Sequence, residues 1–426
     1  MINRKETPQI FSPIEFDYKL PACSTINLDN GIPLYYVNDC IEPVIQIELV
    51  FPAGLWYETK KSIAAATAIL IKSGTSTKTS FQINETFEQY GASVKAGAGN
   101  DWASFSVSCM TRHLDKLLPL MAELITDTIF PQSEIDIYIQ NAKQRMAVQL
   151  KKSDFIANRY IDHYLFGKNH PYGKYSEMED IEAITQKDLQ DFLKEHYSSN
   201  QCKIFMSGQF SEKEVSMVNE YFGKSAWNNQ TTFSPEYHAE ATIEKKHRIT
   251  NDINGVQGSI RILRNFPEKK HPDFTPMIVL NTIFGGYFGS RLMSNIREDK
   301  GYTYGIHSYQ YNNTRGGAYL ITTEAGKEVC EAAIEEIYKE MDLLKNVLVD
   351  EEELTLVKNY LLGTILGDLD GAFQIIQRWK NLILNNFTEE RFYSNIQIYK
   401  SISAEEIQEM AKKYLNREDF YELVVV

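Results

Sequence analysis

The segment GGYFGSRLMSNIREDKGYTYG occupies residues 285–305. Its pattern is typical of a glycine hinge, a short charged helix and an aromatic strand, and it sets Arg297 and Tyr304 where the helix meets the strand. An earlier segment, SIAAATAILIKSGT at residues 62–75, has the same outline but carries no functional side chain. The contrast indicates that one half of an active site is present and that the other half has been lost.

The chain is predicted to contain two copies of one structural plan. Each copy begins with an alternating strand that ends in Phe-Pro, at Ile45–Pro52 and at Ile260–Pro267. An apolar helix running into glycine follows, then a shorter helix that also ends on glycine, and then further strands. Two amphipathic helices are expected to close each copy, at residues 113–130 and 133–152 in the first and at 328–346 and 350–369 in the second.

This order of elements predicts an α+β fold of two tandem homologous domains. Each domain is expected to be a mostly antiparallel sheet with helices packed on one side. The polar segment at residues 225–248 contains Pro235 and has weak periodicity, so it is predicted to be a surface linker. We therefore expect a boundary near residue 235, with an N-terminal domain at 1–235 and a C-terminal domain at 236–426.

Composition narrows the choice of partners and compartment. The 426 residues carry a net charge of -13, which opposes binding to nucleic acid or to anionic lipid. The five cysteines form no C-x-x-C pair, so neither a thiolate metal site nor a disulfide framework is expected. The N-terminus has no apolar leader, and the longest apolar run, Ile63–Ile71, is too short to span a bilayer. These features predict a soluble, cytoplasmic protein, or a periplasmic one if a leader was removed.

Several segments together resemble the insulinase/pitrilysin family of zinc metallopeptidases, in its short two-domain form. They are the duplicated plan, the HPYGK at residues 170–174 and, most specifically, NTIFGGYFGSRLMSNIREDKGYTYGIHSY at 281–309. The resemblance covers nearly the whole chain. It implies that two such chains close around a peptide-sized chamber, and that active members hold zinc with an inverted H-x-x-E-H on the first long helix and a distant Glu.

In this chain the positions that match the zinc motif are Ala65, Ala68 and Ile69. None of these side chains ligates zinc or moves a proton. The region expected to supply the distant ligand, residues 141–151, contains no Glu, and none of the eight histidines has another His four residues away. The resemblance therefore predicts no cofactor in this chain, with zinc carried by a partner.

The other half of the family's site is retained. Members carry an Arg and a Tyr seven residues apart, as Arg297 and Tyr304 are here. The resemblance implies that Arg297 grips a substrate carbonyl and that Tyr304 stabilises the oxyanion of the tetrahedral intermediate. It also implies that backbone glycines let the peptide approach closely and that a turn after the first glycine-rich strand forms a docking edge, which assigns substrate binding to Gly285, Gly286, Gly289 and Asn100.

Simpler explanations exist for each of these residues. Arg297 next to Glu298 is also typical of a solvated helix face, and Tyr304 in an aromatic strand is also typical of strand packing. An ordinary loop accounts equally well for Asn100. His170 before Pro171 is expected to make a local hydrogen bond rather than to act in chemistry.

The predicted function is therefore that of a zinc-free subunit of a two-chain insulinase-type peptidase, inactive alone and able to support proteolysis only as a heterodimer. The alternative is a catalytically inert scaffold or peptide-binding homodimer of the same fold. An independent hydrolase of another type is weakly supported, because no G-x-S-x-G segment and no Cys/His signature is present.

Overall fold

A computed structural model describes residues 12–228, 234–311 and 313–426 of the chain. The contacts within it divide the chain into two compact units. One unit contains residues 22–264, 371–380 and 421–426, and the other contains residues 1–21, 265–370 and 381–420. The N-terminal residues 1–11, on which the expectation of no apolar leader partly rests, lie outside the described residues. No helix in the described part of the chain has the length and apolar character needed to cross a bilayer.

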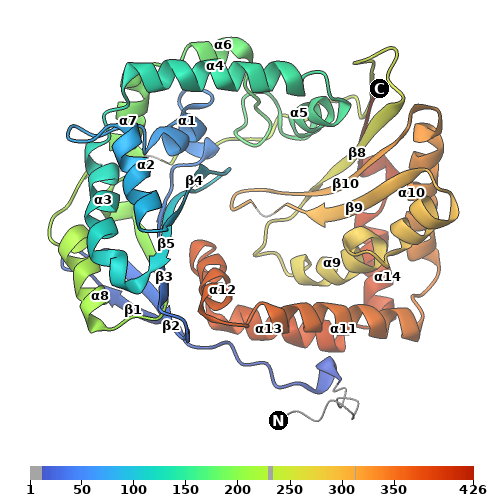
Figure 1. Ribbon diagram of the computed structural model, residues 1–426. Coiled ribbons are helices and arrows are strands. Elements are labelled where there is room, and N and C mark those ends of the chain that lie inside the picture. The colour runs from blue at the N-terminus through green and yellow to red at the C-terminus, as the bar shows by residue number, and fades with distance from the viewer. Residues whose placement is uncertain (1–11, 229–233, 312) are drawn as a thin grey trace, which may run out of the picture. The chain divides into compact units, whose positions relative to one another are not determined.

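The first sheet has six strands in the order β1-β2-β6-β3-β5-β4. Only β2 and β6 pair in parallel, and the other neighbours are antiparallel. Helices α1, α2 and α3 lie on one face of this sheet (Figure 1). The strands are β1 (Ser24–Asn27), β2 (Pro33–Asn38), β3 (Val44–Phe51), β4 (Ser93–Ala98), β5 (Ala103–Met110) and β6 (Lys203–Gly208). The helices are α1 (Ile63–Leu70), α2 (Ser80–Gln89), α3 (Leu114–Asp127), α4 (Gln132–Gln149), α5 (Ser153–Phe166), α6 (Met178–Glu182), α7 (Gln186–His196) and α8 (Glu212–Val218).

The second sheet has five strands in the order β7-β11-β8-β10-β9. The order of its strands repeats that of the last five strands of the first sheet. In both sets of five, the strand that comes last in the chain pairs in parallel with the one that comes first, β6 with β2 and β11 with β7. The strands are β7 (Lys246–Ile249), β8 (Gln257–Phe266), β9 (Thr303–Gln310), β10 (Gly317–Gly326) and β11 (Tyr421–Val425). The helices are α9 (Phe274–Asn281), α10 (Cys330–Asn346), α11 (Glu351–Gly367), α12 (Ala372–Leu384), α13 (Glu389–Ser401) and α14 (Ala404–Tyr414). The repeated topology confirms the predicted α+β fold with a duplicated plan.

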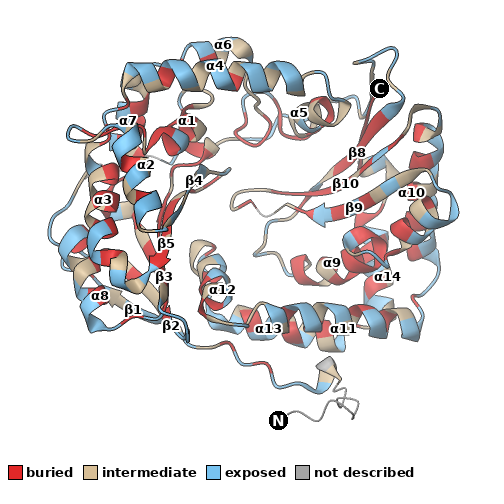
Figure 2. Ribbon diagram, in the orientation of Figure 1, coloured by how far each residue is buried: buried red, intermediate tan, exposed pale blue. Residues whose placement is uncertain are grey.

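One expectation about each copy is wrong. Two helices do not close it, because the chain continues through α5 to α7 and into β6 in the first copy, and through α12 to α14 and into β11 in the second. These closing strands lie inside their sheets and are buried on both faces, as their burial patterns show. The neighbouring strands β3 and β5 of the first sheet are largely buried as well (Figure 2). Strands buried on both faces are short apolar runs in which polar and apolar residues do not alternate. The periodicity of hydrophobic residues therefore does not distinguish them from a short buried helix.

Local signals explain where several helices begin. The Thr79 hydroxyl accepts a hydrogen bond from the amide of Gln82, whose side chain accepts one from the Thr79 amide, and this capping box starts α2. The same box starts α7 at Thr185 and α14 at Ser403. In α1, Ala64, Ala66 and Ala68 are all buried, so the alanine-rich helix packs closely in the core.

The predicted linker is held along the first unit by specific contacts. Pro235 accepts a hydrogen bond from the indole of Trp56 at 2.9 Å, and the amide of Glu240 donates to the carbonyl of Phe166 at 2.9 Å. Residues 229–233 of this segment lie outside the described residues, and Lys246 already belongs to β7. The domain boundary near residue 235 stays a prediction.

Candidate functional site

Arg297 lies on a short π-helix, η7 (Met293–Asp299), which follows a second one, η6 (Thr282–Gly286). Its guanidinium carbon lies 4.6 Å from the centroid of the Phe288 ring, a distance suited to a cation–π contact. Phe288 is itself 65% exposed. The guanidinium is therefore supported on one side by an aromatic face, while its hydrogen-bond donors have no protein acceptor in the part of the chain that the structure describes.

Tyr304 lies on β9, at the edge of the second sheet. In the register of β9 with β10, Ile306 faces Thr323 and Thr303 faces Ala325, so Tyr304 and Gly305 together oppose the single residue Glu324. This is a β-bulge. Without it, Tyr304 would share the face of Ile306, which is fully buried, because side chains alternate along a strand. With it, Tyr304 is 94% exposed.

A small hydrogen-bond cluster holds this bulge. The hydroxyl of Thr303 lies 2.6 Å from the carbonyl oxygen of Glu324 and accepts a hydrogen bond from the amide of Gly305 at 3.0 Å. The hydroxyl of Thr323 donates to the oxygen of Thr303 at 2.8 Å. The backbone on both sides of Tyr304 is thus tied to β10, and the tyrosine ring is left free of packing.

The helix η7 is anchored to its surroundings in three places. At its end, Gly301 has a φ of +66° and the amide of Tyr302 donates to the carbonyl of Ile296, which turns the chain into β9. On its side, the side-chain amide of Asn295 donates to the carboxylate of Glu340 of α10 at 2.7 Å. Just before it, Arg291 makes a bidentate ion pair with Glu353 of α11, at 2.9 and 2.6 Å.

The three glycines predicted to contact substrate differ in their surroundings. Gly285 is buried, and a Cβ there would lie 2.5 Å from the hydroxyl oxygen of Ser308 and 2.9 Å from a methyl carbon of Leu292. Close packing of η6 against β9 therefore explains this glycine without any substrate. Gly286 and Gly289 are exposed, and for these two the substrate-binding role stays a prediction.

The positions that match the family's zinc motif lie on α1, in the other unit. Ala68 is 1% exposed, Ala65 is half-buried and Ile69 is 47% exposed, so the face of α1 that carries Ala65 and Ile69 is open at its surface. All three side chains are hydrocarbon and offer no donor atom to a metal. No group of three or more His, Cys, Asp or Glu able to hold a metal occurs among the described residues. The residues present do not fit zinc.

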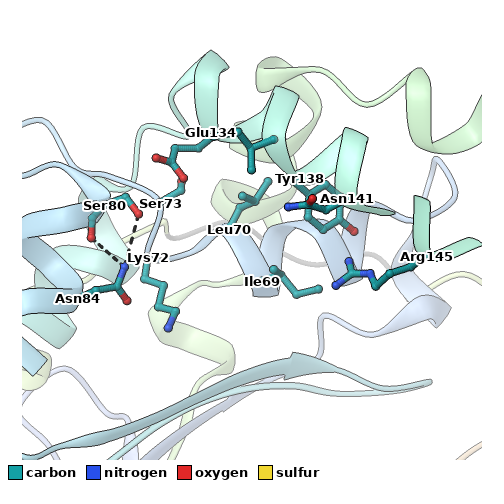
Figure 3. A pocket seen from close by; sticks show the side chains of 11 residues that line it. Ile69, Leu70, Lys72, Ser73, Ser80, Asn84, Glu134, Tyr138, Asn141 and Arg145 are labelled. Atoms are coloured by element: carbon teal, nitrogen blue, oxygen red, sulfur yellow. Dashed lines mark hydrogen bonds between the residues drawn. The ribbon is translucent and has the colours of Figure 1, made fainter. Parts of the chain in front are cut away.

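A pocket of about 230 Å³ opens beside Ile69 (Figure 3). Helix α4 supplies Tyr138, Asn141 and Arg145 to its wall, and residues 141–151 are the region in which the resemblance placed the missing distant ligand. Burial raises the pKa of the Tyr138 hydroxyl, and the guanidinium of Arg145 opposes that rise. A cation thus occupies the region where a metal-binding carboxylate would be needed.

Asn100 lies in the turn between β4 and β5, next to the edge strand β4. Its carbonyl accepts a hydrogen bond from the amide of Trp56 at 2.9 Å, and the preceding carbonyl of Gly99 accepts one from Leu55 at 3.0 Å. A Cβ at Gly54 would lie 2.6 Å from the backbone of Asn100. The turn is therefore fastened to the loop before α1, and a substrate-binding role of Asn100 stays a prediction.

The HPYGK segment is structural. The Nδ1 atom of His170 accepts a hydrogen bond from the amide of Tyr172 at 3.1 Å, which confirms the expected local role of this histidine. Lys174 forms an ion pair of 3.1 Å with Glu58, and Glu58 accepts a hydrogen bond from the amide of Ala64 at the start of α1 at 2.9 Å. Burial raises the pKa of Glu58, and Lys174 opposes that rise. Sequence reasoning missed Glu58, since nothing local marks an acid whose partner lies so far along the chain.

Comparisons with known proteins agree with this description. The model "Insulinase (Peptidase family M16)" matches residues 35–171, and the model "Peptidase M16 inactive domain" matches residues 183–361. The chain is 23% identical over 350 residues to the uncharacterized zinc protease YmxG of Bacillus subtilis, covering 80% of this chain and 83% of that protein. It is 21% identical over 445 residues to the mitochondrial-processing peptidase subunit alpha of Rattus norvegicus, covering 95% and 82%.

A solved structure shares the fold. The crystal structure of a peptidase M16 inactive domain from Pseudomonas fluorescens superposes with a TM-score of 0.84 at 22% identity, covering 95% of this chain and 98% of that one.

Proposed function

This chain belongs to the insulinase family, peptidase family M16, and we propose that it is the non-catalytic subunit of a two-chain peptidase. In this proposal it supplies part of the wall of a peptide chamber, together with Arg297 and Tyr304, to a partner chain that carries the zinc. The proposed substrate is a peptide, and the chain alone does not cleave it.

The observation that carries the proposal is the exposure of Tyr304. A tyrosine ring that is 94% exposed on a strand edge contributes almost nothing to packing, yet a bulge with its own hydrogen-bond cluster turns it outward. A phenol held in this way is suited to donate a hydrogen bond to an oxyanion, a contact that lowers a barrier by roughly 3 kcal/mol. The guanidinium of Arg297 is suited to hold a peptide carbonyl.

The chemistry of α1 supports the other part of the proposal. Since Ala65, Ala68 and Ile69 offer no ligand atom, the metal and the proton-transferring carboxylate must come from elsewhere. One relative named above is a zinc protease and another is a subunit of a processing peptidase, which supports zinc on a partner and a heteromeric assembly. We further propose a cytoplasmic location, which fractionation of cells would test.

The test is reconstitution with a relative that bears H-x-x-E-H. We expect the complex to cleave a fluorogenic peptide and each chain alone to be inactive. Changing Arg297→Ala or Tyr304→Phe should lower kcat/KM roughly 10²- to 10³-fold while leaving the complex intact. Tyr309→Phe is the matched control, because Tyr309 is an exposed tyrosine on the same strand, and this variant should retain activity.

Two outcomes contradict the proposal. Unchanged turnover in both variants, with the complex intact, would leave the scaffold or the peptide-binding homodimer as the function. Stoichiometric zinc and chelator-sensitive activity in the purified lone chain would show that a metal site exists within it.

A further inference from the structure

The pocket beside Ile69 has features of a binding site in its own right. It lies within one compact unit, between the end of α1, the start of α2 and the face of α4. Its volume of about 230 Å³ matches a single amino-acid residue more closely than a cofactor. All the residues that line the pocket belong to this unit, so binding there is independent of the function proposed above.

One part of the pocket wall is apolar. Ile69 is 47% exposed and Ile137 is 53% exposed, and both line the pocket together with Leu70. When an apolar ligand covers branched aliphatic side chains that otherwise contact water, binding is favoured by about 25 cal/mol per Å² of buried apolar surface. This part of the wall therefore favours a hydrocarbon side chain.

Two cations lie beside this apolar wall. In Figure 3, Lys72 and Arg145 are on either side of Ile69, and both line the pocket. Neither makes an ion pair or hydrogen bond within the described ranges. By contrast Lys143, on the same helix as Arg145, is paired with Glu182. Glu134 is the one acid among the residues that line the pocket, and in this view Leu70 lies between it and Arg145. The end of the pocket at Ile69 thus lacks a negative charge.

A buried hydroxyl in the wall also lacks a partner. Ser73 is 4% exposed, and its hydroxyl makes no hydrogen bond in the part of the chain that is described. A buried hydroxyl without a partner is unusual and requires an acceptor to recover the lost hydrogen bond. The hydroxyl oxygen has almost no exposed surface, so a ligand in the pocket would reach it only after the Ser73 side chain rotates.

The pocket also continues beyond a single residue. A second pocket of about 320 Å³ shares Ser73, Ser80 and Glu134 with it, and its remaining wall consists largely of serine and threonine residues. A ligand can therefore extend from the apolar, cationic end into a polar channel. This favours an extended chain over a compact anion such as phosphate, which would leave Ile69 and Ile137 uncovered.

We propose that this pocket binds the carboxy terminus of a peptide whose last residue is apolar. The carboxylate lies between Lys72 and Arg145, where a guanidinium can bind it with two parallel hydrogen bonds. The apolar side chain covers Ile69 and Ile137, and the preceding residues lie in the polar channel, which Ser73 also lines.

The experiment measures binding of a fluorescent pentapeptide that ends in leucine to the purified lone chain, by anisotropy. We expect the free-acid peptide to bind roughly tenfold or more tightly than the same peptide with a carboxy-terminal amide, because the amide removes the charge. Arg145→Gln and Lys72→Gln should each weaken binding of the acid to a similar extent. Lys143→Gln is the control on the same helix and should bind as the unaltered protein does.

A competition arm distinguishes a peptide from a small acid. We expect N-acetyl-leucine to compete far more weakly than the pentapeptide, and competition of equal strength would overturn the peptide assignment. Equal binding of the acid and the amide, or no binding at millimolar peptide, would overturn the proposal as a whole. Thermal unfolding of each variant checks that the fold is kept, which we expect because neither Lys72 nor Arg145 makes a hydrogen bond or an ion pair within the described ranges. Because the binding assay contains the lone chain without a partner, a negative result in it would leave the proposed peptidase function untested and intact.

Discussion

The guanidinium of Arg297 rests on the ring of Phe288, with 4.6 Å between the guanidinium carbon and the ring centroid. An arginine on a short helix has several rotatable bonds, so an aromatic support restricts its conformations and, in the proposed complex, lowers the entropic cost of binding a peptide. Because Phe288 is largely exposed, packing gives it little other purpose. We therefore regard it as a positioning residue for Arg297, and the sequence offered no sign of that role.

Removal of this support should weaken peptide cleavage moderately. A cation–π contact at an exposed site contributes about 0.5 to 1 kcal/mol, so Phe288→Ala in the reconstituted complex should lower kcat/KM roughly two- to fivefold. The effect should disappear in a background of Arg297→Ala, as a double-mutant cycle would show. Phe81→Ala removes another exposed phenylalanine and should have no effect. If kcat/KM of the complex with Phe288→Ala were unchanged, Arg297 would not need the Phe288 ring to hold its guanidinium in place.

The bulge that exposes Tyr304 should depend on Thr303. In Thr303→Val the hydroxyl that joins Gly305, Glu324 and Thr323 is lost, and the two strands lose the cross-links of the bulge. We expect the free energy of unfolding in urea to fall by about 1 to 3 kcal/mol. Thr322→Val is the matched control, because its hydroxyl makes no hydrogen bond in the described structure and it lies beside Thr323 on β10. A stability loss of the same size in both variants would assign the effect to the strand and not to the bulge.

Much of this fold could be predicted because helical periodicity and the Phe-Pro strand ends repeat along the chain. The helices α3, α4, α10 and α11 begin and end within a few residues of their predicted positions. The strands β6 and β11 could not be identified, because they take their place in the sheet from pairing with residues far away in sequence.

The candidate site likewise has residues that the sequence marks and features that only the tertiary structure reveals. Arg297 and Tyr304 are marked by local spacing, so a sequence is enough to select them. The bulge at Tyr304 depends on the register with β10, and the pairing of Glu58 with Lys174 depends on the tertiary fold. Arg145 lies within residues 141–151, the region in which the resemblance places a metal-binding Glu. Its positive charge is the sequence signal that could have marked the pocket beside Ile69 as a different kind of site.

The packing of η6 against β9 should make Gly285 irreplaceable. In Gly285→Ala the new methyl carbon would lie 2.5 Å from the Ser308 hydroxyl oxygen, and Ser308 is held by a hydrogen bond to Asn281. Such overpacking costs about 1 to 3 kcal/mol of stability, which chemical denaturation would measure. Gly363→Ala is the control within helix α11, where no atom lies within 4 Å of a new Cβ. That variant should be neutral or more stable by up to about 1 kcal/mol, because alanine favours helix over glycine.

Acid should destabilise the unit that contains α7 through His196. This histidine is 3% exposed and packs against the rings of Tyr57 and Phe192, with centroid distances of 5.5 and 4.5 Å. Burial lowers the pKa of His196 from 6.5 to about 4. The unfolded chain therefore takes up a proton more readily than the folded one, so the stability that neutral His196 provides is present above pH 6.5 and is lost as the pH falls toward 4. Over that range the loss is at most about 3 kcal/mol.

Urea unfolding between pH 7 and pH 4.5 would measure this loss. In His196→Gln the position no longer titrates, so the decline in stability across that range should become shallower than in the unaltered protein. His238→Gln removes an exposed histidine and should leave the slope unchanged. If His196→Gln showed the full decline, other groups would have to account for the acid sensitivity, and His196 would have to be accessible to protons without unfolding.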